Sequence, residues 1–93
     1  MDRYHVYMMT NKHNTVLYTG VTGNLGERVS AHMVGAGGKF TSKYNVNKLV
    51  YFEAFAHIDE AIAREKQLKR WKRSWKNKLI EKSNPDWSEL TTW

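Results

Sequence analysis

Residues 4–21 read YHVYMMTNKHNTVLYTGV, and this segment decides the fold. Tyr4–Thr10 and Val16–Val21 are rich in aromatic and β-compatible residues, and the polar residues 11–14 between them are typical of a turn. The segment therefore predicts a β-hairpin. Because side chains alternate between the faces of a strand, one face should carry Tyr4, Val6 and Met8, the other His5, Tyr7 and Met9, and the second strand should place Val16, Tyr18 and Gly20 together.

A helix is predicted directly after the hairpin. Asn24 is a typical N-cap, and Glu27 follows three residues later, as in a capping box. We expect this helix from Leu25 to Val34, where the glycine-rich segment 35–38, GAGG, ends it. Residues 39–47 are polar, and we expect them to be irregular.

A third strand is predicted over Leu49–Phe55, with Val50, Phe52 and Ala54 on one face. The resulting order is β-β-α-β-α, and the C-terminal region leaves a further helix open. A hairpin and one later strand, covered by helices, predict a small three-stranded sheet in an α/β fold.

The longest helix should begin at Ile58 or Asp59. Leu79 and Ile80 either extend it or belong to a short second helix packed across it, and Asn84-Pro85 stops helical structure. The apolar stripe of the helix consists of Ile58, Ala61, Ile62, Leu68, Trp71 and Trp75, at helical spacing.

Positive charge is concentrated near the C-terminus. The formal net charge is +6, and nine of the fifteen Lys and Arg residues lie between Arg64 and Lys82. Such a stretch favours a polyanionic partner, nucleic acid before an anionic membrane, and a solvated helix face is the alternative. Trp71 and Trp75 lie within it, and core packing is favoured over stacking on nucleobases because both complete the apolar stripe.

Length and composition limit the classes of protein to which this chain can belong. The 93 residues suffice for one compact core, so we expect a single domain, with its core at about residues 4–82 and a tail at 83–93. There is no cysteine, which excludes disulfides and thiolate zinc sites. No apolar segment is long enough for a membrane-spanning helix or a signal peptide, so we expect a cytoplasmic protein without a membrane partner.

Several polar residues occupy positions that suit chemistry. Glu65 falls within the apolar stripe, where a carboxylate needs a cation or a metal ion, and pattern alone favours neutralisation by a neighbouring Arg or Lys. Arg28 and His32 share one helix face and could bind a phosphate and move a proton, although spacing alone favours an exposed surface. Tyr7 and Tyr18 lie in paired strands, where ordinary sheet packing is the simpler interpretation.

Taken in order, these residues resemble the GIY-YIG endonuclease family, including the catalytic domains of its homing endonucleases and of its excision-repair nucleases. HVY at residues 5–7 and YTG at residues 18–20, with ten residues between them, are similar to the paired tripeptides that name the family. The match extends from about residue 4 to residue 87. It is closest to the small stand-alone bacterial members, in which segments such as LIE at 79–81 and NPDW at 84–87 are typical.

The resemblance implies a central three-stranded antiparallel sheet flanked by helices. It also implies hydrolysis of DNA phosphodiester bonds with one divalent metal ion, Mg²⁺ or Mn²⁺. By the same resemblance Glu65 is the metal ligand, Arg28 contacts the phosphate, and Tyr7 and Tyr18 line the site, one of them helping to activate the attacking water. His32 occupies a position that some members use.

Two features depart from the family pattern. His5 stands where the name of the family has Gly, although both named tyrosines remain. The distal active-site asparagine is ambiguous, because Asn77 lies twelve residues after Glu65 and Asn84 lies nineteen after it.

The sequence thus predicts a metal-dependent DNA endonuclease, acting as a monomer on branched, damaged or otherwise structured DNA in repair or processing. The alternative is a non-catalytic nucleic-acid-binding module on the same scaffold, and the intact set of candidate catalytic residues argues against it. The residues expected to contact nucleic acid are Arg28, Lys39, Lys69, Lys72, Arg73 and Lys76.

Overall fold

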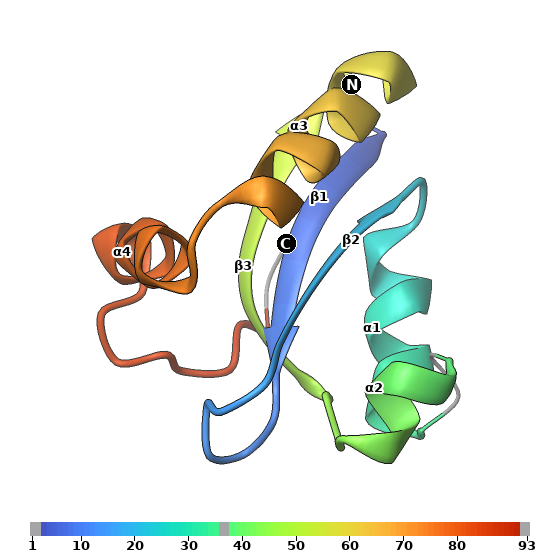
Figure 1. The fold of residues 1–93 in the computed structure, drawn as a ribbon. Coiled ribbons are helices and arrows are strands. Elements are labelled where there is room, and N and C mark those ends of the chain that lie inside the picture. The colour runs from blue at the N-terminus through green and yellow to red at the C-terminus, as the bar shows by residue number, and fades with distance from the viewer. Residues whose placement is uncertain (1–2, 36–37, 92–93) are drawn as a thin grey trace.

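A computed structural model describes residues 3–35 and 38–91 of the chain. Three strands form one antiparallel sheet in the order β2-β1-β3, with helices on both faces, which confirms the predicted α/β fold (Figure 1). The elements in chain order are β1 (Tyr4–Thr10), β2 (Leu17–Thr22), α1 (Leu25–Met33), α2 (Lys39–Lys43), β3 (Lys48–Phe55), α3 (Ile58–Arg70) and α4 (Arg73–Ser83).

The central strand β1 divides the core into two clusters, one on each face of the sheet. Val6 and Met8 point toward α3 and α4, whereas Tyr7 and Met9 point toward α1, as the alternation predicts. Strand β1 is covered on both faces, and all five residues from Val6 to Thr10 are buried. The α3-side cluster contains Val6, Met8, Val50, Ala61, Leu68, Ile80 and Trp87; the α1-side cluster contains Tyr7, Met9, Leu25, Val29, Val46 and Leu49.

Helix α1 begins as predicted. The Asn24 Oδ1 accepts a hydrogen bond from the Glu27 backbone N–H at 3.1 Å, and the Asn24 Nδ2 donates to the Glu27 carboxylate at 3.3 Å. The helix ends at Met33, one residue before the predicted end. Val29 is buried, whereas Met33 is 51% exposed.

Strand β3 contains an irregularity that the alternation did not predict. Its pairing with β1 passes over one residue, Val50, between two consecutive β1 positions. Val50 consequently joins the α3-side cluster, whereas Phe52 packs against the α1-side cluster. The expectation that Val50, Phe52 and Ala54 share one face is wrong, because an extra residue in a strand shifts the alternation beyond it.

Residues 39–47, expected to be irregular, include the short helix α2. Gly38 precedes it with φ 133°, a conformation that favours glycine, and the Thr41 hydroxyl donates to the Gly38 carbonyl at 3.4 Å. Thr41 and Val46 are buried, which anchors this segment to the rest of the domain. Residues 36 and 37 of the predicted glycine-rich segment lie outside the described residues.

The basic C-terminal region forms two helices, which confirms the second of the two alternatives. Helix α3 ends at Arg70, Trp71 and Lys72 adopt extended backbone, and α4 begins at Arg73. Because the chain turns there, Trp75 does not continue the stripe of α3. It is 50% exposed, so its predicted core position is wrong, whereas Trp71 is partly buried against the α3-side cluster.

The buried face of α3 is narrower than the predicted stripe. Ala61 and Leu68 are fully buried, whereas Ile58 and Ile62 are exposed. Glu65 lies between these two buried positions, one turn from each, and its side chain is 15% exposed. The contact of α3 with the sheet therefore brings a carboxylate close to the strands.

The tail after α4 packs along the outer edge of β3. The buried Asn84 amide donates to the carbonyls of Val50 and Ser88, at 3.1 and 2.9 Å, and the Leu90 N–H donates to the Leu49 carbonyl at 2.8 Å. Trp87 is 7% exposed and belongs to the α3-side cluster. Residues 84–90 thus contribute to the core.

Candidate active site

Tyr7 and Gly20 face each other across the hairpin and place a hydroxyl at the edge of the sheet. They are direct partners in the β1–β2 register, and the Tyr7 ring is 2% exposed. A Cβ atom at Gly20 would lie 2.5 Å from the Tyr7 hydroxyl oxygen and 2.6 Å from Cζ. Only glycine leaves room for this ring, so the YTG tripeptide positions the tyrosine of the HVY tripeptide.

A methyl group at this position should therefore displace Tyr7. For Gly20→Ala we expect a loss of roughly 1–3 kcal/mol in the free energy of unfolding, because the ring must move in a packed core. Gly23→Ala is the matched control, since its Cβ would meet Tyr4 at an ordinary 3.7 Å. Chemical denaturation of both variants measures the difference, and equal stabilities would contradict the tight packing of Tyr7 on Gly20.

Three aromatic side chains form the centre of the candidate site. The ring centroids of Tyr7, Tyr18 and His32 are 5.6 to 6.2 Å apart. The Tyr7 hydroxyl and the His32 Nε2 are 3.4 Å apart, within hydrogen-bonding distance. His32 is 3% exposed, and its Nδ1 has no hydrogen-bond partner among the described residues. The expectation of an exposed helix surface, favoured by spacing alone, is therefore wrong for His32.

The surroundings shift the protonation of two of these groups. Burial, followed by the nearby Tyr18, raises the pKa of the Tyr7 hydroxyl above its ordinary value; Arg28 opposes this rise and Glu65 adds to it. Burial and the positive charge of Arg28 lower the pKa of His32, so the imidazole is uncharged at neutral pH.

Arg28 lies on an exposed part of α1 beside an open hollow of about 430 Å³. Within residues 3–35 and 38–91, no hydrogen bond or ion pair holds its guanidinium. Its charge acts on both Tyr7 and His32, which places it near the aromatic centre. The hollow is lined by Thr22, Gly23, Asn24, Glu27, Arg28 and Ala31.

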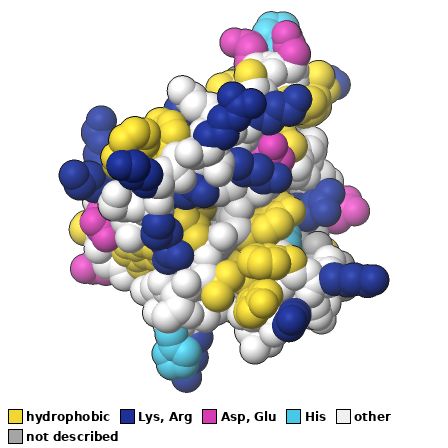
Figure 2. Space-filling view, in the orientation of Figure 1, with side chains coloured by type: hydrophobic (Ala, Val, Ile, Leu, Met, Phe, Trp, Pro, Cys, Tyr) yellow, Lys and Arg dark blue, Asp and Glu magenta, His cyan; other side chains and the backbone are white. Residues whose placement is uncertain are grey.

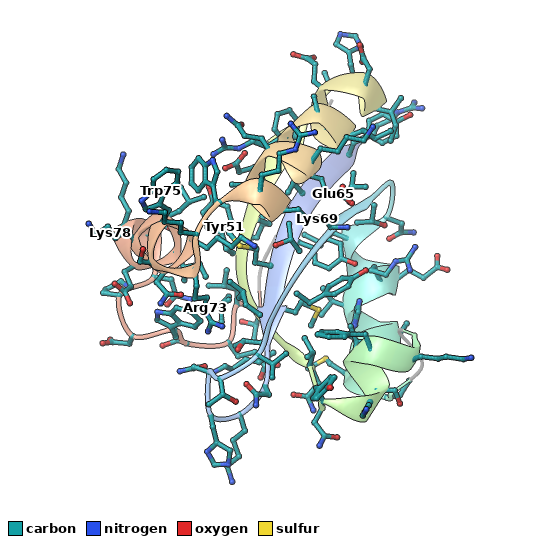
Figure 3. The ribbon with its side chains drawn as sticks, viewed as in Figure 1. Tyr51, Glu65, Lys69, Arg73, Trp75 and Lys78 are labelled. Atoms are coloured by element: carbon teal, nitrogen blue, oxygen red, sulfur yellow. The ribbon has the colours of Figure 1, made fainter. Side chains whose placement is uncertain are left out.

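Glu65 approaches the site from α3. Figure 3 shows Glu65 and Lys69 on the side of α3 that faces β1 and β2. The Glu65 Oε2 lies 3.4 Å from the Lys69 Nζ, as the expected neutralisation by a nearby Lys predicts. No group of three or more His, Asp or Glu side chains suited to a metal ion occurs in the described part of the chain. The charge of Glu65 adds to the rise in the pKa of the Tyr7 hydroxyl, so this carboxylate lies near enough to act on that group.

Two of the predicted basic contacts, Lys69 and Lys76, lie beside Tyr18 of this centre. Lysine and arginine side chains gather over α3 and α4 (Figure 2). Lys69 and Lys76 line a groove with Tyr18, and Lys39 is exposed at the start of α2. Lys72 is exposed at the start of α4, where its Nζ lies 5.7 Å from the Trp75 ring centroid.

Arg73 has a structural contact that spacing did not predict. Its guanidinium donates to the backbone carbonyls of Asn14 at 2.9 Å and Thr15 at 3.3 Å, and to the Asn77 side chain at 2.9 Å. It therefore joins α4 to the turn of the hairpin. The two candidate asparagines also differ: Asn77 is half-buried beside Arg73, whereas the Asn84 amide is bonded to the tail on the β3 edge.

Phe40 is a candidate site residue that the sequence did not single out. Its ring centroid lies 6.3 Å from that of Tyr18, and the side chain is 48% exposed. The sequence feature that could have identified Phe40 is an aromatic residue within a polar segment, two residues after a glycine pair.

Comparisons with known proteins show which family this domain belongs to. A model of the GIY-YIG catalytic domain matches residues 3–79. A UPF0213 protein of Staphylococcus haemolyticus is 40% identical over 81 residues, covering 87% of this chain and 98% of the relative. A UPF0213 protein of Clostridium perfringens is 43% identical over 76 residues, covering 82% and 81%.

A solved structure is also similar. The solution NMR structure of a UPF0213 protein from Bacillus halodurans aligns with a TM-score of 0.58 and 28% identity, covering 90% of this chain and 88% of that one. The family match over most of the chain confirms the resemblance carried by the two tripeptides and the two helices. The chain therefore belongs to the GIY-YIG catalytic domain family and is similar to its small UPF0213 members.

Proposed function

We propose that this protein is a metal-dependent endonuclease that hydrolyses DNA phosphodiester bonds. A nuclease-type family implies a nucleic-acid substrate. The observation that carries the proposal is that the charges of Arg28 on α1 and Glu65 on α3 both act on the pKa of one buried hydroxyl, that of Tyr7. An arginine, a carboxylate and tyrosines around one point suit phosphodiester hydrolysis.

Glu65 is the residue proposed to hold a divalent cation. Mg²⁺ is commonly bound in proteins by one or two carboxylates, with water and substrate phosphate oxygens completing the shell. A single carboxylate whose nearest cation, Lys69, is 3.4 Å away fits this donor set once a phosphate is present. When bound, Mg²⁺ or Mn²⁺ would neutralise charge on the phosphate and favour ionisation of the attacking water.

Arg28 is proposed to bind the phosphate that is cut. Negative charge grows on the phosphate oxygens as water attacks, and a planar, permanently charged guanidinium fork suits those oxygens. An exposed guanidinium without a protein partner among the described residues is available for this contact.

A tyrosine is proposed to take the proton of the attacking water. The raised pKa of Tyr7 keeps this hydroxyl protonated at rest, so it needs an acceptor for its own proton. The uncharged His32 offers Nε2 at 3.4 Å. We therefore propose a transfer from water to Tyr7 and from Tyr7 to His32, with Tyr18 as the alternative base.

The test is incubation with single-stranded, duplex, flapped and branched DNA, with and without Mg²⁺ or Mn²⁺. The proposal expects cleavage of at least one form only when metal is added. A structured substrate as the preferred form would support a role in repair or processing. Binding without cleavage of every form would favour the non-catalytic nucleic-acid-binding module instead.

The lysine and arginine side chains over α3 and α4 should make DNA binding sensitive to salt. If they neutralise about five phosphates, affinity should fall ~10²–10³-fold between about 50 and 200 mM salt. Lys76→Ala should reduce the slope of log affinity against log salt by about 1. Lys78→Ala is the matched control, because Lys78 lies on the side of α4 away from β2 (Figure 3). Equal slopes for the two variants, measured by fluorescence anisotropy, would contradict a contact between Lys76 and the DNA backbone.

A further inference from the structure

A groove beside Tyr18 combines aromatic walls with two cations. Its volume is about 260 Å³, and it lies where β2, α2 and the basic ends of α3 and α4 meet. Figure 2 shows hydrophobic side chains exposed next to lysine and arginine side chains on this face of the molecule. The groove is lined by Leu17, Tyr18, Thr19, Phe40, Lys69 and Lys76.

Phe40 presents an open aromatic face in this groove. The side chain is 48% exposed although Tyr18 and Tyr44 flank it, with ring centroids at 6.3 and 4.9 Å. These neighbours form a row of three tilted rings. An aromatic ring supported in this way loses little conformational freedom when a further flat ring stacks on it.

The cations of the groove are suited to an anion. Lys69 and Lys76 both line it, and burial, followed by the charges of Arg73 and Lys69, lowers the pKa of Lys76. Glu65 is the acidic residue that pairs with this group within the described residues, at 3.4 Å from Lys69. A phosphate near the two lysines would therefore relieve repulsion between like charges.

We propose that this groove binds one unpaired nucleobase, with its ring against Phe40 and its phosphate near Lys69 and Lys76. The inference rests on the proposed function, because Glu65 and Tyr18 place the groove next to the phosphate that is cut. A base inside a duplex is covered on both faces by its neighbours, so only an unpaired or terminal base can stack on a protein ring. The groove therefore selects nucleic acid by structure and tolerates any base.

Trp75 is the competing stacking residue and provides a matched control. It is 50% exposed, close to the value for Phe40, and also lies near a lysine. Its side chain points away from β2, on the outer side of α4 (Figure 3). Phe40→Ala and Trp75→Ala thus remove aromatic rings of similar exposure, one inside the groove and one outside it.

The experiment measures binding without cleavage. Each variant is made in a Glu65→Gln background, and affinity in EDTA is measured for an oligothymidylate of ~10 nucleotides and for the same backbone without bases. Relative to the Glu65→Gln background protein, Phe40→Ala should bind oligothymidylate about tenfold more weakly. Its affinity for the abasic strand should equal that of the background protein. Trp75→Ala should bind both strands as the background protein does.

Three results would overturn the inference. An equal loss for both strands would mean that Phe40 does not contact a base. Unchanged affinity of Phe40→Ala, or a loss only in Trp75→Ala, would place the base elsewhere. Because the readout is binding in EDTA, the dependence on Phe40 stands or falls separately from cleavage. If binding depends on Phe40 but the protein cuts no DNA, the proposed endonuclease activity is contradicted and the base-binding groove is supported.

Discussion

Replacing Glu65 with Gln is expected to abolish metal-dependent cleavage while leaving the fold and DNA binding in place. Glutamine has the same shape but no charge, and a neutral amide is a weak ligand for a hard divalent cation. The Glu65 side chain is 15% exposed, and glutamine fills the same space; the ion pair that is lost joins it to the exposed Lys69 at 3.4 Å. Pairs of this kind are worth little to stability.

The measurement compares cleavage of the preferred DNA substrate by Glu65→Gln and by Glu60→Gln. Glu60 lies in the first turn of the same helix and is exposed, so its replacement makes the same change in charge. Thermal unfolding and DNA affinity should match the unmodified protein in both variants. Full cleavage by Glu65→Gln, or cleavage that persists in EDTA, would remove Glu65 as the metal ligand.

Replacing Arg28 with Ala should lower the cleavage rate on the order of 10²–10³-fold, by analogy with the loss of one oxyanion donor. The side chain is exposed and has no protein partner in the described ranges, so unfolding should change little. Arg28→Lys should restore only a small part of the rate, because an ammonium cannot reproduce the planar fork.

A matched control separates this effect from the general attraction between protein and DNA. Lys12→Ala removes one positive charge from the turn of the hairpin, at the opposite end of β2 from α1. Single-turnover rates at saturating protein should fall for Arg28→Ala alone. If Lys12→Ala slows cleavage equally, Arg28 acts through net charge and makes no specific contact with the phosphate.

Local rules in the sequence were sufficient to predict the hairpin and the first helix. Strict alternation identified both faces of β1, and the Asn24–Glu27 pair marked the start of α1. These features depend on neighbours within a few residues. The irregularity at Val50 and the exposure of Trp75 depend on how the chain turns and pairs in three dimensions, and periodicity carries no information about either.

In the candidate site, too, some features follow from local sequence and others only from the three-dimensional fold. Spacing grouped Arg28 with His32, and family resemblance selected Glu65, but neither predicted that His32 is buried against Tyr7. That contact forms only when α1 packs on the sheet. Phe40 was missed because helix α2 is too short to show a periodic pattern, and its ring meets Tyr18 only through the fold.

The hydrogen bonds of the tail at Asn84 and Leu90 cover one edge of the sheet. A sheet of three strands has two edges, and an unpaired edge invites pairing with a second molecule and aggregation. Here the carbonyls of Leu49 and Val50 on the β3 edge already accept hydrogen bonds from the tail. The β2 edge is the one bordered by lysines, whose repulsion opposes self-association. The β3 edge is thus covered by the chain's own C-terminal segment, and the β2 edge is lined by positively charged side chains.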